Sequence, residues 1–419
     1  QNSPHATPSR DKRQDDAPKT PTTDEPNDLH ITGNSFLPRL ASVCFLLVIA
    51  LGLRTMTDSG IIDLQLGTLL GVFYASALII TSWGLYSKQN VLAPVFSCCG
   101  AVLIFSVTFE TFVHFEAFPI EIAYILFAMT GIVLAVISHT QRVAAPILIG
   151  TLGMCLAGVA LDFPTPYFPY IALLLWLANI LGFFASRIEH CSWLRWLLLG
   201  ITLTMLQTWG LRIGIAPMRG ELVEPLAPGW LLPIAALISV TYISISLLGI
   251  IRSGERRISK FDFCLPTVMA CYGFLVGMTI LKGSVAFSLF ITLAGLGHLA
   301  IAYFMSRRQI DHSPGTNAFT LAGTVLLSFS LPILFDSLLL ALPILSVLAL
   351  LIAHLSSKWG NGGMRITSYL LQIYTSAILM IKLIGYDVDS GAIVPILSAA
   401  ICATTSMLHF RFCRRISPP

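Results

Sequence analysis

The chain has 419 residues, of which 55% are hydrophobic and only 11% are charged. Because soluble domains carry about 25% charged residues, this composition excludes a soluble enzyme. The net charge of +4 is small and becomes informative only when it is divided between the two sides of a membrane. Length here counts membrane crossings, since each crossing of about 30 Å of hydrocarbon takes about 20 apolar residues.

Residues 1–35 are rich in Pro, Thr, Asp and Lys and contain no apolar run. A segment of this kind cannot bury enough apolar surface to fold, so we expect a disordered cytoplasmic tail. It contains no dense basic cluster, and we expect no nucleic-acid partner. Residues 36–415 form the second part of the chain, a predicted transmembrane helical domain.

Apolar runs separated by charged residues, Pro and Gly predict an all-α polytopic membrane protein with about fourteen transmembrane helices. The predicted helices cover residues 37–57, 63–86, 91–113, 118–140, 142–161, 167–186, 192–212, 229–251, 261–281, 284–306, 316–334, 336–356, 365–385 and 389–413. Two apolar stretches are about twice the length of one crossing. Lys282 interrupts the first and Asp336 the second, so we expect each charge at the turn of a tight hairpin, where it reaches the interface.

The basic residues predict the orientation, because Lys and Arg accumulate on the cytoplasmic side of a membrane. With the N-terminus inside, most of the 25 Lys and Arg residues fall in inner segments. The outer side keeps only Arg54, Arg212, Arg219, Lys282 and Lys382. We therefore predict that both termini are cytoplasmic.

Two outer turns share a pattern. The segments LRTMTDSGIIDLQLG and IKLIGYDVDSGAIVPIL each place a basic residue near a helix end, followed by an acid, Ser-Gly and a new apolar run. The chain could therefore consist of repeated two-helix hairpins, although turn chemistry alone can also produce this pattern.

The basic residues in these and similar turns are candidates for substrate binding. One interpretation is that Arg54, Arg212, Lys282 and Lys382, with Asp58 beside Arg54, converge on an anionic substrate such as a lipid phosphate. The alternative is that each long side chain reaches the outer headgroups and pairs with a nearby acid.

Glu110 and His114 lie four residues apart and would share one face of a helix, a spacing that suits a proton relay. An exposed turn explains the same residues. No second pair of ligands follows at a metal-binding spacing, so we predict no metal and no cofactor.

Polar residues also occur deep in predicted helices, at Asn179, Gln207 and Gln372. Hydrogen bonds between helices, worth about 1 kcal/mol, account for such residues. A phosphate-binding glycine loop, a nucleophile elbow and a metalloprotease helix are all missing from the sequence.

From residue 36 to about residue 195, the chain resembles a bacterial family of uncharacterised polytopic membrane proteins known as domain of unknown function 2339. The resemblance rests on FLPRLASVCFLLVIALGLRTMTDSGII, on GTLLGVFYASALII and on the succession of hairpins with short loops. It implies a multi-pass protein of the bacterial inner membrane. No catalytic residues are established for that family, so the resemblance implies an architecture and a location only.

Two functions remain open from the sequence. The first is a transporter or flippase for an envelope-related amphiphile or a small anion, with lipids and a lipid-linked or anionic small molecule as ligands. The second is a non-catalytic membrane scaffold that holds partner proteins. A lipid-linked glycosyltransferase is a more distant alternative, because such enzymes usually carry a large outer domain.

Overall fold

The computed structural model describes residues 31–113, 119–161, 167–188, 192–220, 222, 226–253, 258–281, 283–307, 314–384 and 393–416. These residues form α-helices and one short 3₁₀ helix, Ala216–Arg219, with no strand in the described ranges. The helices are α1 (Ile31–Asp58), α2 (Leu64–Ser87), α3 (Ala93–Val113), α4 (Ile120–Gln141), α5 (Ala145–Leu161), α6 (Phe168–Ile188), α7 (Ser192–Ile215), α8 (Pro228–Ser253), α9 (Lys260–Leu281), α10 (Val285–Arg307), α11 (Pro314–Leu334), α12 (Leu338–Trp359), α13 (Gly362–Ile384) and α14 (Ile393–Ile416).

The predicted all-α polytopic fold is confirmed, because 13 of these helices are long and apolar enough to cross a membrane. The remaining helix, α5, has 17 residues and lies at the short end of the range for a crossing. Helix α1 begins at Ile31, earlier than predicted, and Pro38 lies inside it rather than at its start.

The predicted hairpin at Asp336 is also confirmed. Helix α11 ends at Leu334 and α12 begins at Leu338, and Asp336 adopts a φ of 48° in the turn between them. Asp tolerates this left-handed conformation better than most residues, since its short side chain can bond locally. Lys282, predicted at the other long hairpin, lies outside the described residues, between α9 and α10.

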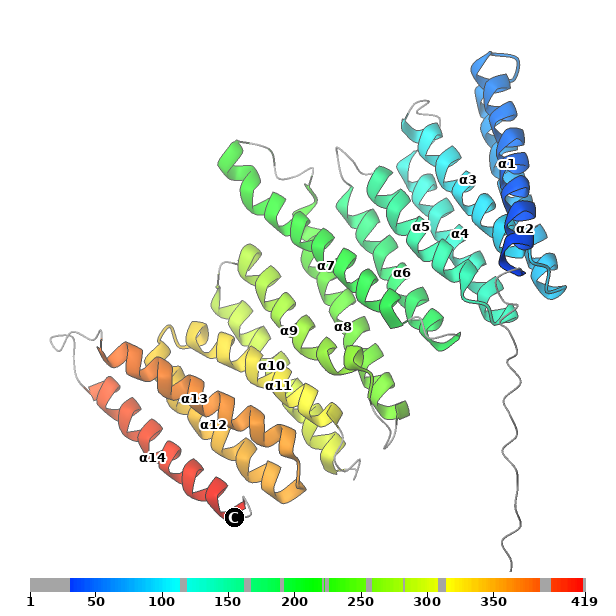
Figure 1. Cartoon of the computed structure of the whole chain (residues 1–419). Helices are drawn as coiled ribbons and strands as arrows, with labels where there is room; N and C mark the ends of the chain where they lie inside the picture. Colours follow the sequence, from blue (N-terminus) through cyan, green and yellow to red (C-terminus); the bar gives the residue numbers. More distant parts are fainter. Residues whose placement is uncertain are drawn as a thin grey trace, which may run out of the picture.

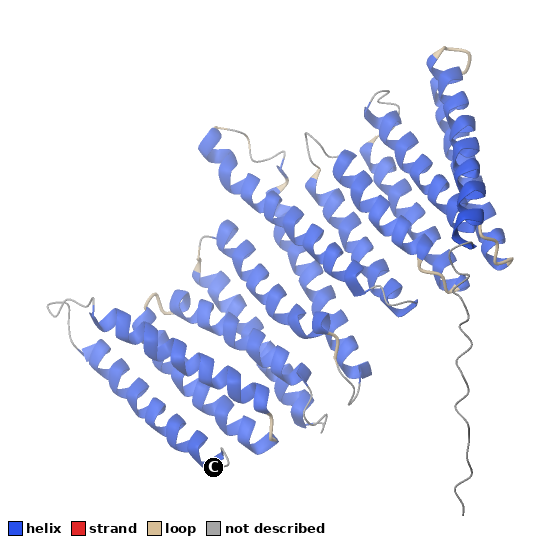
Figure 2. Ribbon diagram, in the orientation of Figure 1, coloured by secondary structure: helices blue, strands red, loops and turns tan. Residues whose placement is uncertain are grey.

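The helices form an open serial array (Figure 1). Within the described residues, extensive packing joins only helices that are one or two positions apart in the chain, such as α4 with α5 and α6, or α12 with α13 and α14. Helices α1 and α14 lie at opposite ends of the array, and the axes turn progressively between them (Figure 2). Such connectivity resembles that of repeat proteins, in which each unit contacts its neighbours alone.

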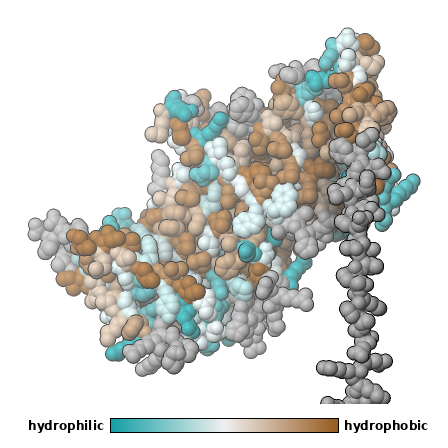
Figure 3. Space-filling view, in the orientation of Figure 1, coloured by the Kyte–Doolittle hydropathy of each residue, from teal (hydrophilic) through white to brown (hydrophobic). Residues whose placement is uncertain are grey.

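Burial follows from this arrangement. Only 6% of the apolar window of α1 is buried, against 56% for α3, because the first helix packs on one side only. Much of the visible surface is apolar, with smaller hydrophilic patches distributed over it (Figure 3). A lateral surface of this kind is stable in hydrocarbon, where the helices also satisfy their own backbone hydrogen bonds.

Two glycines, Gly295 on α10 and Gly323 on α11, bring the backbones of neighbouring helices into close contact. A Cβ atom added at Gly323 would lie 2.8 Å from the carbonyl oxygen of Gly295, and one added at Gly295 would lie 3.2 Å from the carbonyl oxygen of Gly323. Small residues permit such contact between backbones, which is a main source of helix association in membranes.

We predict that Gly323→Ala lowers stability by about 1–3 kcal/mol, because the new methyl group overlaps a backbone oxygen and forces the helices apart. Gly297→Ala on α10 is the matched control, since nothing lies within 4 Å of its added Cβ. That variant should be neutral or slightly stabilising, as Ala favours helix more than Gly does. Thermal unfolding in detergent measures both; equal melting temperatures for the two variants would contradict the close-contact account.

Candidate functional site

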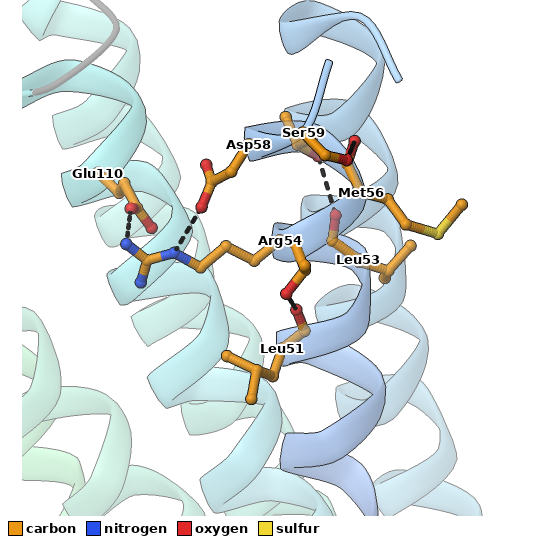
Figure 4. A network of polar contacts seen from close by, with 9 residues as sticks. Leu51, Leu53, Arg54, Met56, Asp58, Ser59 and Glu110 are labelled. Atoms are coloured by element: carbon orange, nitrogen blue, oxygen red, sulfur yellow. Dashed lines mark hydrogen bonds and ion pairs between the residues drawn. The ribbon is translucent and has the colours of Figure 1, made fainter. Parts of the chain in front are cut away.

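Arg54, near the C-terminal end of α1, is the centre of a charged cluster (Figure 4). The charge distribution predicts that this cluster lies at the outer face of the membrane. Arg54 forms an ion pair with Glu110 on α3 through Nη2, and its Nε lies 3.6 Å from Asp58 one helical turn later. The side chains of Arg54 and Asp58 are half exposed, whereas that of Glu110 is only 18% exposed. The guanidinium is thus balanced by two carboxylates, and the cluster carries a net negative charge.

A cavity of about 70 Å³ lies beside this cluster, between α1, α2 and α3. Thr68, Thr111 and Tyr74 contribute polar atoms to its wall, and Gly67 and Gly71 leave room for it. A water molecule needs about 10–15 Å³ of such space, whereas pockets for drug-sized ligands measure about 300–1,000 Å³. The cavity therefore suits a few water molecules or a small ion and is too small to enclose an amphiphile.

The structure does not bring the predicted outer cations together. Arg54 lies on α1, Arg212 in the last turn of α7 and Lys382 in the last turn of α13, and these helices are widely separated along the array (Figure 1). Arg212 and Lys382 are exposed. Lys282, the fourth, lies outside the described residues.

Of the two residues of the predicted proton relay, the structure describes only Glu110. Glu110 forms an ion pair with Arg54, and His114 lies outside the described residues. The described residues contain no group of three or more His, Cys, Asp or Glu side chains placed to hold a metal ion.

A second charged pair lies at the opposite, predicted inner face. Arg195 in the first turn of α7 and Asp262 in the first turn of α9 form an ion pair of 2.5 Å, with side chains only 10% and 9% exposed. The guanidinium also lies 4.2 Å from the centroid of the Phe261 ring, a cation–π contact. Ser246 of α8 donates a hydrogen bond to the Asp262 carbonyl, so the pair ties α7, α8 and α9 together.

Space for this ion pair depends on Gly249 of α8. A Cβ added there would lie 2.7 Å from an Asp262 carboxylate oxygen. Because a buried carboxylate has few alternative positions, a larger residue at position 249 would displace Asp262 from Arg195.

The deep polar residues form local networks. Asn179 donates to Thr202 at 2.7 Å and accepts a hydrogen bond from the Tyr242 hydroxyl, joining α6, α7 and α8. Gln372 donates to Ser346 and Ser406, joining α13 to α12 and α14. The prediction that Asn179 and Gln372 bond between helices is confirmed. Gln207 is half-buried, and nothing in the structure assigns it a role.

The charge distribution in the sequence puts Arg195 with the basic residues of the inner segments, and no sequence pattern assigns a role to Asp262. The two residues are 67 positions apart, and no local spacing connects them. The available signal was that both lie just inside the inner ends of apolar helices, where an unpaired charge would be costly.

We predict that Asp262→Leu lowers stability by about 3–5 kcal/mol, because it leaves Arg195 buried without a partner. The double variant Arg195→Met, Asp262→Leu should recover most of that loss, since it removes both charges. Thermal unfolding of the three proteins in detergent micelles tests this. A double variant as unstable as the single one would show that the ion pair itself, rather than the penalty for an unpaired charge, holds these helices.

Comparison with known proteins adds no relative: no family model, curated protein or solved structure matches the chain. The resemblance to the uncharacterised bacterial family therefore stays a prediction. The chain is a multi-pass membrane protein by the length and apolar character of its helices.

Proposed function

We propose that this protein is a membrane scaffold, in which a long row of helices holds other membrane components along its lateral surface. The observation that carries the proposal is the serial packing, in which helices contact extensively only their near neighbours in the chain. An array of this kind has a long perimeter relative to its interior. Repeat proteins use the same geometry to present extended binding surfaces.

The distribution of polar groups supports the proposal. A transporter places its substrate and ion sites at a common region near the middle of the bilayer, between two bodies that move. Here, the Asn179 network and the Arg195–Asp262 pair share α7 and α8 and lie beside one cavity of only about 10 Å³, which holds no more than a water molecule. The Gln372 network belongs to a separate set of helices, α12, α13 and α14. Each network satisfies its own members, which is what holding adjacent helices together requires.

Photo-crosslinking in living cells tests the proposal. A photoreactive amino acid is placed, one site at a time, at strongly exposed apolar positions spread along the array: Phe73, Leu156, Val240, Phe290 and Ile373. For a scaffold, we expect discrete protein adducts from neighbouring positions, because partners would occupy a continuous stretch of surface. The same adducts should recur with defined sizes in independent preparations.

Phe127 and Ala349, which are fully buried, are the control positions and should give no adduct. If all exposed positions yield lipid adducts only, the lateral surface faces bulk lipid and the scaffold proposal is wrong.

A second candidate is a transporter or flippase for an anionic amphiphile, which would bind Arg54 itself and not the negatively charged cluster as a whole. Arg54 is half exposed at the predicted outer face, where a lipid phosphate could reach it. Glu110 competes for the same guanidinium. An anionic headgroup would therefore have to displace this carboxylate, with its chains remaining in the bilayer outside the small cavity.

This candidate predicts opposite effects of two variants on the binding of a short-chain phosphatidic acid, measured by calorimetry in detergent. Glu110→Gln should strengthen binding several-fold, because it frees the guanidinium. Arg54→Gln combined with Glu110→Gln should weaken binding about tenfold relative to the single variant, by removing a charge-assisted hydrogen bond. Identical affinities in all three proteins would eliminate Arg54 as a substrate-binding residue.

A further inference from the structure

A groove of about 510 Å³ opens on the lateral surface between α4 and α6, away from the charged clusters described above. Its apolar wall comes from Ile125 and Ala128 of α4 and from Leu173, Leu174 and Leu177 of α6. Ile125 is 60% exposed, whereas Leu174 is only 4% exposed, so the groove has an accessible rim and a buried floor. Its volume is about seven times that of the cavity beside Arg54.

The end of the groove nearest the predicted outer face is polar and aromatic. Glu121, in the first turn of α4, is exposed and accepts a hydrogen bond of 3.2 Å from the Tyr170 hydroxyl of α6. The centroid of the Tyr170 ring lies 5.7 Å from the centroid of the Tyr124 ring and 6.4 Å from that of the Tyr167 ring. Among the described residues, no Lys or Arg lies within ion-pair distance of Glu121.

A carboxylate beside several aromatic rings is a favourable setting for an ammonium group. The carboxylate supplies the opposite charge, and the faces of tyrosine rings attract cations. An anionic headgroup would instead meet a repulsive carboxylate. The charge at this end of the groove therefore selects a ligand whose exposed group is cationic.

The length of the groove across the membrane favours a lipid over a transmembrane helix as its occupant. Its lining on α4 runs from Glu121 to Ala128, a rise of about 10 Å at 1.5 Å per residue. This is less than half of the roughly 30 Å of hydrocarbon. A lipid chain occupies one leaflet only, whereas a partner helix would pack along the full thickness.

We propose that this groove is a binding site for a phospholipid with an ammonium headgroup, such as phosphatidylethanolamine. The ammonium group contacts Glu121 and the tyrosine rings, and an acyl chain lies against Ile125, Ala128 and Leu173. The inference is independent of the scaffold proposal, since a bound lipid is compatible with either function.

Native mass spectrometry tests the site, with protein released from nanodiscs that contain equal amounts of phosphatidylethanolamine, phosphatidylcholine and phosphatidylglycerol. We expect at least one retained ethanolamine or choline lipid per chain, in clear preference to phosphatidylglycerol. Glu121→Gln should reduce this preference about tenfold through loss of the charged contact.

Two further variants test the groove itself. Ala128→Phe fills it and should also lose the retained lipid, whereas Ala300→Phe adds the same bulk at an exposed position of α10 and should not. Asp63→Asn removes an exposed outer carboxylate elsewhere and should leave retention unchanged. Equal retention of all three lipids, or a preference that survives Glu121→Gln, would overturn the proposal. A photoreactive residue at Ile125 that captures a polypeptide instead of lipid would overturn it as well.

Discussion

The structure depends on one constraint: in hydrocarbon, a chain must satisfy its backbone hydrogen bonds internally. Helices meet that requirement one at a time, so apolar segments are folded locally before they pack. The remaining requirement is that neighbouring helices associate without the hydrophobic effect, which drives association in water. This chain uses close contact, as at Gly295 and Gly323, and local polar bonds, as between Asn179 and Thr202. Both kinds of contact join a helix to the next helix in the chain, which is consistent with an open array.

Charged residues divide between the two faces of the array with different roles. At the predicted inner face, Arg195 and Asp262 are buried, paired and in contact with aromatic rings, so they fix the positions of three helices. At the predicted outer face, Arg54 is half exposed and shared between two carboxylates. Glu121 remains exposed beside tyrosines. The Arg195–Asp262 pair therefore serves structure, while Arg54 and Glu121 are accessible from the surface.

Much of the fold could be predicted, because the length and apolar character of a crossing are local properties of the sequence. Asp336 at the hairpin turn and the interhelical bonds of Asn179 and Gln372 followed from the cost of polar groups in hydrocarbon. Asp58, four residues from Arg54, was a predictable partner. Glu110 as the second partner of Arg54 and Asp262 as the partner of Arg195 were not, because they are 56 and 67 residues away and only helix packing brings them together. The groove between α4 and α6 was equally hidden, since its apolar residues match those of any crossing helix.

The open array is the central claim, and a distance between its ends tests it most directly. The distance between spin labels at Ser59, after α1, and at Val394, in α14, can be measured by pulsed electron paramagnetic resonance in nanodiscs. Neighbouring helices pack about 8–10 Å apart, so a row of this length should separate the labels by well over about 40 Å. A distribution centred below about 30 Å would mean that the first and last helices meet in a closed bundle, and the account of an extended lateral surface would be wrong.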